Sequence, residues 1–294
     1  MRRTRAEKLF NVFNISFLGL TAFICLVPLL NTLAISLSDT LPVNRNQVTL
    51  WPVEINLKAY SFLLNNDRFW RAALVSIYRV LLGSLINMVL IVLCAYPLSK
   101  EPGKFQFRSL YSWLFVVTML LNGGLIPTFM LVSGLGLLDT IWSLVLPGAV
   151  NVFNMVLMLN FFRGIPAELE EAATIDGAGH FRILWQIYIP CALPAIATVL
   201  LLSVVGHWNA WFDGIIYSNK LESYPLQSYL QTIIVGLQMM NNEMSVERYA
   251  LFSQLNERSI RSAQIIIAML PVAMVYPFLQ RYFVTGIVVG SVKQ

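Results

Sequence analysis

Long runs of apolar residues dominate the chain. Five of six such runs contain no Asp, Glu, Lys or Arg, and the sixth contains only Arg79. The runs are Leu9–Ser38, Ala72–Leu98, Ser109–Leu138, Thr140–Phe162, Ile183–Phe212 and Ser262–Gln280. A helix that crosses a bilayer needs about 20 mostly apolar residues, and every run is long enough or nearly so. The pattern predicts an all-α integral membrane protein with six transmembrane helices.

The runs divide the chain into helices and connecting segments. The first transmembrane helix is predicted at residues 10–37, and a core of residues 71–282 contains the other five. These five helices are placed at about 72–98, 109–132, 140–162, 188–212 and 262–282. The remaining segments are the N-terminus 1–9, the loops 38–70, 164–189 and 213–261, and the tail 283–294.

Lysine and arginine are distributed unequally between the two sides of this bundle. Six spans place both termini on one side, where eleven of these residues lie in the termini and in 99–109 and 163–189. The segments on the opposite side are longer in total but hold only seven. Because cytoplasmic segments carry the excess of positive charge, we predict that both termini and the loop 164–189 are cytoplasmic. Residues 38–70 and 213–261 are then outer loops.

The composition excludes several classes of protein. The 294 residues are 57% hydrophobic and 12% charged, about half the charge of an average soluble domain, so an ordinary soluble enzyme is excluded. The net charge of +5 comes from short segments between apolar runs, which indicates membrane topology rather than nucleic-acid binding. The three cysteines lie in apolar runs, and the sequence contains neither a phosphate-binding G-x-x-x-x-G-K-[ST] motif nor metal-ligand histidine spacing. We therefore expect no cofactor in this chain.

The loop 164–189 contains a predicted short helix. Pro166 suits a first helical position, and three glutamates that follow it complement the positive end of the helix dipole. Gly177 can adopt the left-handed conformation that ends a helix. Leu169, Ala172 and Ala173 lie on one side, where two alanines allow another surface to approach closely. An amphipathic helix on lipid headgroups is the alternative, but the glutamates make an anionic membrane surface a poor host.

The same loop carries a recognisable motif. Glu171-Ala172-Ala173 is followed at fixed spacing by Gly177, Ile187, Ile189 and Pro190. This pattern resembles the EAA loop of ABC-importer permeases, in which leucine is usual at the position of Ile189. Four further segments are similar to the second permease of maltose-type oligosaccharide importers, especially the aldouronate, pectin-fragment and alginate-fragment relatives. These segments are 122–127, 175–178, 207–212 and 224–227.

The resemblance implies a type I ABC-importer permease in a bacterial cytoplasmic (inner) membrane. The implied partners are a second homologous permease, two ATP-binding subunits that hold ATP and Mg, an extracytoplasmic solute-binding protein and an oligosaccharide substrate. The implied ATPase-coupling residues are Glu171, Ala172, Ala173, Asp176, Gly177 and Pro190. The tail resembles one that inserts between the ATPase subunits, with Gly286, Gly290 and Ser291 as contacts; a terminus held loosely on headgroups is the alternative.

Polar side chains inside the spans each allow a structural and a functional interpretation. Arg79 has a structural role, by snorkelling to the headgroups or by forming a hydrogen bond between helices, or it marks a functional site. Asn151 and Asn154, with Asn160, either join helices or face a polar cavity. At the end of the fifth span, Trp208, Asn209 and Trp211 form either an interfacial belt or a sugar path. Trp208 and Trp211 would share one side of a continuous helix, with Asn209 offset by about 100°.

Other functions fit the sequence less well. An integral membrane enzyme would need a clustered catalytic constellation, which the sequence does not contain. A stand-alone secondary transporter would normally have a longer chain, inverted repeats or several intramembrane acids. The nearest alternative is the same ABC-importer machinery serving a non-sugar solute.

The predicted topology can be tested by labelling. Lys220 lies in the outer loop 213–261, so a membrane-impermeant amine reagent should label it in intact cells, or in spheroplasts if an outer membrane is present. Tags at both termini should be reached only after lysis. Protection of Lys220 until lysis would contradict the predicted orientation.

Overall fold

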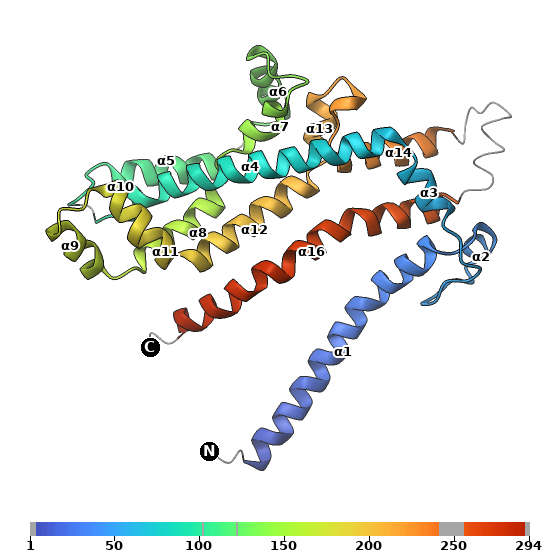
Figure 1. Ribbon diagram of the computed structural model, residues 1–294, viewed down its shortest axis with the longest axis horizontal. Helices are drawn as coiled ribbons and strands as arrows, with labels where there is room; N and C mark the ends of the chain where they lie inside the picture. Colours follow the sequence, from blue (N-terminus) through green and yellow to red (C-terminus); the bar gives the residue numbers. More distant parts are fainter. Residues whose placement is uncertain (1–3, 102, 122, 241–255, 292–294) are drawn as a thin grey trace. The chain divides into compact units, whose positions relative to one another are not determined.

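The computed structural model describes residues 4–101, 103–121, 123–240 and 256–291 (Figure 1). These residues form helices and their connections, with one isolated antiparallel β-bridge between Ser38 and Ile55. The prediction of an all-α protein is confirmed.

Among the described residues, three helices are long and apolar enough to cross a membrane by themselves. They are α1 (Arg5–Ser36), α4 (Asp67–Ser99) and α16 (Glu257–Ser291). Three bent pairs each reach the required length together, which gives up to six spans. The pairs are α5 (Arg108–Leu120) with α6 (Leu125–Gly134), α7–η1 (Ile141–Gly148) with α8 (Val152–Arg163), and α10–η2–α11 (His180–Cys191) with α12 (Leu193–Asn209).

Local residues account for two of the bends. Between Ile141–Gly148 and α8 the helix axis turns by 50°. Pro147 lies just before this turn. Asn151 then caps α8, because its side-chain oxygen accepts a hydrogen bond from the Asn154 N–H at 3.1 Å. Between His180–Cys191 and α12 the turn is 82°. Pro190 and Pro194 flank this turn and cannot donate backbone hydrogen bonds. The sequence predicted one transmembrane helix at about 140–162 and one at about 188–212.

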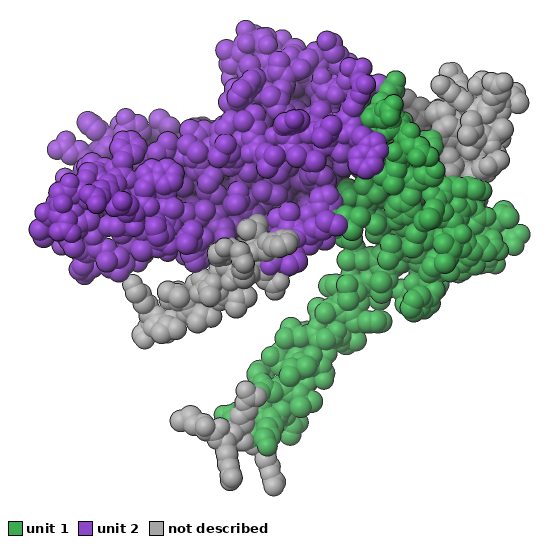
Figure 2. Space-filling model, viewed as in Figure 1, with its two compact units in different colours: residues 1–69, 232–270 green, residues 70–231, 271–294 purple. Residues whose placement is uncertain are grey.

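The chain forms two compact units (Figure 2). Unit 1 comprises residues 1–69 and 232–270 and includes α1, α2 (Thr40–Asn44) and α3 (Lys58–Leu64). Its small core contains Ala34, Ile35, Val43 and Val48. The start of α16 is held to the end of α2 and the turn that follows it, because Asn256 donates to Asn44 and Arg258 donates to Asn46, each at 2.6 Å.

Unit 2 comprises residues 70–231 and 271–294 and contains the candidate functional residues. Its core packs the second half of α4 against α8, α12 and the π-helical segment η2 (Leu184–Tyr188). The most deeply buried members of this core are Ile91, Ala95, Met155, Met158, Phe162, Leu184, Ala192, Ala195 and Val199. This packing fixes the positions from which α4 and α12 present polar side chains.

The predicted outer loop 213–261 is helical over much of its described length. It contains most of α13 (Phe212–Tyr217), η3 (Leu221–Ser223), α14 (Leu226–Met240) and the start of α16. Within unit 2, Asp139 accepts hydrogen bonds from the backbone and side chain of Asn219 at 2.6 and 3.0 Å. Ser76 accepts from the Leu226 N–H at 2.7 Å. The Asp139 bonds hold the segment after α13 to the turn before α7, and the Ser76 bond holds the start of α14 to α4.

The C-terminal segment continues as helix beyond the predicted span, because α16 extends to Ser291. The contacts of Gly286, Gly290 and Ser291 lie outside what the structure describes. Their contact with an ATPase stays a prediction.

Close packing between α4 and α12 generates a prediction about stability. A Cβ atom on Gly83 would lie 2.5 Å from His207 Nε2, whereas a Cβ on Gly206 would meet nothing within 4 Å. We expect Gly83→Ala to destabilise unit 2 by about 1–3 kcal/mol through overpacking. Gly206→Ala is the matched control and should be neutral or slightly stabilising. Thermal unfolding in detergent measures both, and equal melting temperatures would contradict the packing.

Candidate functional site

The predicted coupling loop contains helix α9 (Ala167–Ile175). Pro166 occupies the N-cap position, one residue earlier than expected. At the other end the Gly177 N–H bonds to Thr174 O and the Ala178 N–H bonds to Ala173 O, at 3.0 and 2.9 Å. These two bonds form a Schellman motif, which requires a left-handed residue after the cap. Gly177 has φ of 78°, so the predicted positive φ is confirmed.

Most of the predicted coupling residues lie on the exposed surface of this loop. Glu171, Ala172, Asp176 and Gly177 are exposed, and Ala173 is half-buried against the core of unit 2. Ile175 is apolar and yet 86% exposed. Pro190 is exposed on a different element, α11 (Ile189–Cys191). The exposed residues of α9 offer a short surface to a partner.

One buried residue of α9 was not identified as a site residue in the sequence analysis. Glu170 is only 7% exposed. Its Oε2 accepts hydrogen bonds from Lys100 Nζ at 2.8 Å and from Tyr188 Oη at 2.7 Å. The Lys104 ammonium lies 3.7 Å from its other oxygen. Glu170 therefore joins α9 to the segment that follows α4 and to η2.

Aromatic rings complete this cluster. Lys100 Nζ lies 3.9 Å from the centroid of the Tyr96 ring and 4.0 Å from that of the Tyr188 ring. Burial by itself raises the pKa of the Glu170 carboxyl, but the hydrogen bonds from Lys100 and Tyr188 and the nearby lysine charges outweigh it. The pKa of Glu170 is therefore held below its ordinary value of 4.5. We call Glu170, Lys100, Tyr96 and Tyr188 the α9 joint.

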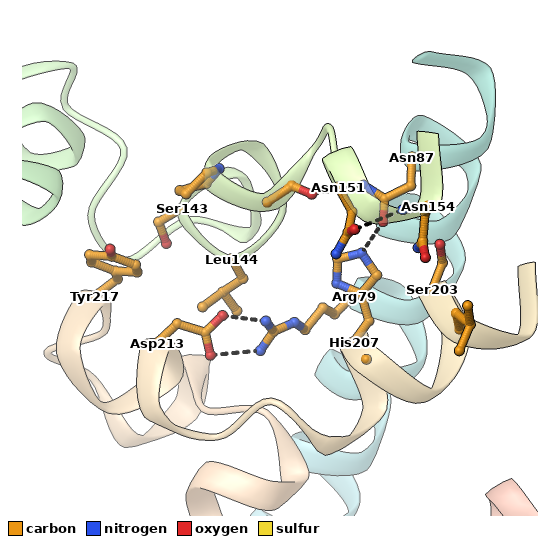
Figure 3. Close-up of a pocket in the computed structure, with 14 residues that line it drawn as sticks. Arg79, Asn87, Ser143, Leu144, Asn151, Asn154, Ser203, His207, Asp213 and Tyr217 are labelled. Carbon is orange, nitrogen blue, oxygen red and sulfur yellow. Dashed lines mark hydrogen bonds and ion pairs between the residues drawn. The ribbon is translucent and has the colours of Figure 1, made fainter. Parts of the chain in front are cut away.

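A second polar group of residues surrounds a cavity of about 360 Å³ in unit 2 (Figure 3). The polar lining residues come from α4, the α7–α8 segment, α12 and α13. They are Arg79, Asn87, Ser143, Asn151, Asn154, Ser203, His207, Asp213 and Tyr217. Sites of this volume hold small ligands.

An ion pair closes one side of the cavity. Arg79 is 2% exposed, and its two terminal nitrogens donate to the two carboxylate oxygens of Asp213. Nη1 also donates to the Ala210 carbonyl at 3.3 Å. The snorkelling interpretation of Arg79 is therefore wrong, and the hydrogen bond between helices is the observed arrangement. Asp213 is held at the start of α13, where it also accepts the Gly214 N–H at 2.9 Å.

Asn87 on α4 contacts two other elements that line the cavity, the bend before α8 and α12. Its side-chain amide donates to the carbonyls of Gly148 and Ala149 at 3.0 and 2.7 Å, and its oxygen lies 2.9 Å from His207 Nε2. The two carbonyls lie at the bend before α8, where the regular helical bonds are interrupted. Asn87 thus satisfies backbone groups that a break inside a membrane would leave unpaired.

The residues of the predicted sugar path lie in two separate places. Asn151 and Asn154 line the cavity, whereas Trp208, Asn209 and Trp211 are not among its lining residues. Trp208 is buried, Asn209 is exposed and Trp211 is 44% exposed. Because α12 ends at Asn209 and Ala210 is extended, the assumption that Trp208 and Trp211 share one helix is wrong. In the described part of the chain no group of His, Cys, Asp and Glu could hold a metal ion.

Comparison with protein families identifies the chain. The model of the binding-protein-dependent transport system inner membrane component matches residues 88–289. The chain belongs to this family. It is therefore a multi-pass membrane protein of the transport-permease class, and the resemblance drawn from the EAA loop is confirmed.

Relatives align over the whole chain. The polygalacturonan/rhamnogalacturonan transport system permease protein YtcP of Bacillus subtilis is 38% identical over 98% of this chain and 99% of its own length. Protein LplC of the same organism is 38% identical over 100% of this chain and 98% of its own. A crystal structure of a bacterial ABC transporter for the acidic polysaccharide alginate contains a chain with a TM-score of 0.83 and 33% identity, covering 96% of this chain and 99% of that one.

The buried carboxylate yields a prediction for α9. Glu170→Gln would leave the buried Lys100 ammonium without a counter-charge, which costs about 3–5 kcal/mol when one partner of a buried pair is removed. Hydrogen exchange of the α9 amides should become about a hundredfold faster or more. Glu168→Gln, at an exposed position of the same helix, should leave exchange unchanged.

The pH dependence provides a control for the same prediction. Because the pKa of Glu170 is depressed in the folded protein, its contribution to the stability of α9 is fully present above pH 4.5. This contribution is lost as the pH falls through the lower pKa of the folded protein. The extra protection of wild-type α9, relative to Glu170→Gln, should therefore disappear in acid. Equal exchange rates for the two proteins at neutral pH would exclude the α9 joint as a stabilising contact.

Proposed function

We propose that this protein is one of two permease subunits of an ATP-driven bacterial importer for oligosaccharides. The observation that carries the proposal is α9, a helix with an exposed surface and a buried attachment. Family membership and the full-length similarity to transport permeases support it. In this proposal six spans cross the inner membrane, both termini are cytoplasmic, and ATP and Mg are bound by two separate subunits. An external binding protein delivers the substrate.

The geometry of α9 suggests how ATP hydrolysis reaches the membrane. An ATPase subunit would contact the exposed residues Glu171, Ala172 and Asp176. A displacement of α9 then passes to α4 through the Glu170–Lys100 ion pair and to η2 through the bond from Tyr188. Because both contacts are buried and charge-assisted, they resist being pulled apart during the movement.

The substrate class is inferred from the relatives. YtcP is named for polygalacturonan and rhamnogalacturonan, and the alginate importer for an acidic polysaccharide. We propose that this permease likewise carries fragments of a uronate-containing polysaccharide. The cavity supports a sugar substrate, because amide, hydroxyl and imidazole groups can replace water at sugar hydroxyls. The Arg79–Asp213 pair neutralises the buried charge there, which limits the affinity for any one anionic sugar unit.

The loop assignment is tested by two glycine variants that differ in backbone conformation. Gly177 has φ of 78°, whereas Gly179 has φ of −74°, and neither has an atom within 4 Å of its Cβ position. We expect Gly177→Val to strain the Schellman motif and reduce substrate uptake at least tenfold, with membrane insertion retained. Gly179→Val should transport normally. The measurements are uptake of oligogalacturonides and substrate-stimulated ATP hydrolysis by the purified complex.

Copurification separates the possible failures. Mass spectrometry of the purified complex should find a second permease and an ATP-binding subunit, whereas transport by the isolated chain would contradict the proposed class. Normal uptake by Gly177→Val would refute the role of the loop. Selective uptake of a non-sugar solute would refute the proposed substrate alone.

A further inference from the structure

A second pocket in unit 2 lies beside the α9 joint, at the end of α4. Its volume is about 330 Å³. The lining is mostly apolar with basic groups among it, and it includes Leu93, Tyr96, Lys100, Lys104, His180 and Phe181. None of these residues lines the cavity of Figure 3. We call this pocket the α4 groove.

The length of α4 places the groove at the level of lipid headgroups. Trp70 lies near the start of α4 and is 56% exposed, as is usual for a tryptophan at a membrane interface. From Trp70 to Leu93 the helix rises about 35 Å, at 1.5 Å per residue. The hydrocarbon core is about 30 Å thick. With Trp70 at the outer interface, Leu93 and the groove lie at the cytoplasmic interface.

An exposed apolar stripe on α4 leads to this groove. Seven large side chains, each at least 45% exposed, recur every three or four residues along one side of the helix, where Ile77 and Tyr78 are adjacent members. They are Leu74, Ile77, Tyr78, Leu81, Leu85, Val89 and Leu93. Leu93 belongs to both the stripe and the groove. The apolar wall continues beyond α4 with Phe181, which is 72% exposed. An acyl chain lying on the stripe would end at the groove.

The charge in the groove is not fully neutralised. Glu170 accepts its 2.8 Å hydrogen bond from Lys100, and the Lys100 ammonium is enclosed by two tyrosine rings. Lys104 has only a 3.7 Å contact to Glu170, and its side chain is 44% exposed. Its ammonium therefore retains donors for another anion. His180, also in the lining, is exposed and can donate a further hydrogen bond.

We propose that the α4 groove binds an anionic phospholipid of the cytoplasmic leaflet. The phosphate lies between Lys104 and His180, and an acyl chain follows Leu93 and the apolar stripe. Basic pockets between membrane helices on the cytoplasmic side suit such headgroups. The proposal goes beyond the transport function and uses the orientation proposed above. It also places a lipid charge next to Lys104, which contacts Glu170 of the α9 joint.

Lipid retention by the complete purified complex tests this site. The complex is exposed to an equal mixture of phosphatidylglycerol and phosphatidylcholine, and native mass spectrometry counts the lipids that remain bound. The wild type should retain phosphatidylglycerol preferentially. Lys104→Gln should weaken this binding about fivefold, the contribution of a single basic residue near an anionic surface. Lys104→Arg should preserve it, because the positive charge is kept.

Control measurements distinguish the groove from the rest of the basic cytoplasmic surface. Lys8→Gln removes a basic residue from the same predicted side, but Lys8 does not line the groove, so retention should not change. Inorganic phosphate should not displace phosphatidylglycerol, because it lacks the acyl chain. Equal retention of the two lipids, an unchanged Lys104→Gln variant or displacement by phosphate would each overturn the lipid site. Loss of the ATPase subunit from Lys104→Gln would also overturn it and assign the groove to a protein partner.

Discussion

Burying the Glu170 carboxylate is unfavourable unless other groups compensate for the loss of water, and this requirement organises the end of unit 2 that carries α9. Compensation comes from Lys100, which follows α4, and from Tyr188 in η2. If either residue moved away, the buried Glu170 carboxylate would lose a compensating partner in an apolar environment. A nine-residue helix is too short to be stable by itself in water. The ion pair therefore does more to position α9 than the intrinsic helix propensity of its sequence.

The cavity follows the same physical rule inside the membrane. Arg79 is buried in a span whose other residues are almost all uncharged, and Asp213 from α13 supplies the opposite charge. Asn87 satisfies the carbonyls at the bend before α8. Polar groups in a bilayer are retained where protein partners or a cavity replace water. The bends therefore create both the backbone groups that need partners and the space that a polar substrate could enter.

Local patterns predicted much of the fold and part of the site. The apolar runs coincide with the candidate membrane helices and bent pairs, and the position of Gly177 after a short helix indicated its left-handed conformation, because both features depend on neighbouring residues. The partners of Glu170 and Arg79 could not be predicted in this way. Three glutamates follow Pro166 closely, and only tertiary packing buries Glu170 against Lys100, which is 70 residues distant. The end of α12 before Ala210 likewise involves a tertiary contact, since the Ala210 carbonyl accepts a hydrogen bond from Arg79.

The α9 joint and the cavity are connected by one continuous helix. Arg79 and Asn87 lie on α4, and Lys100 follows the last residue of that helix. The path through α12 contains the 82° turn near Ala192, so a displacement along it can be absorbed by bending. By contrast, α4 is one continuous helix for about 30 Å between Arg79 and Ser99, at 1.5 Å per residue, with Pro97 only in its last turn. A rigid helix transmits displacement better than a hinged one, and under the proposed coupling α4 is therefore the more direct path from α9 to the cavity.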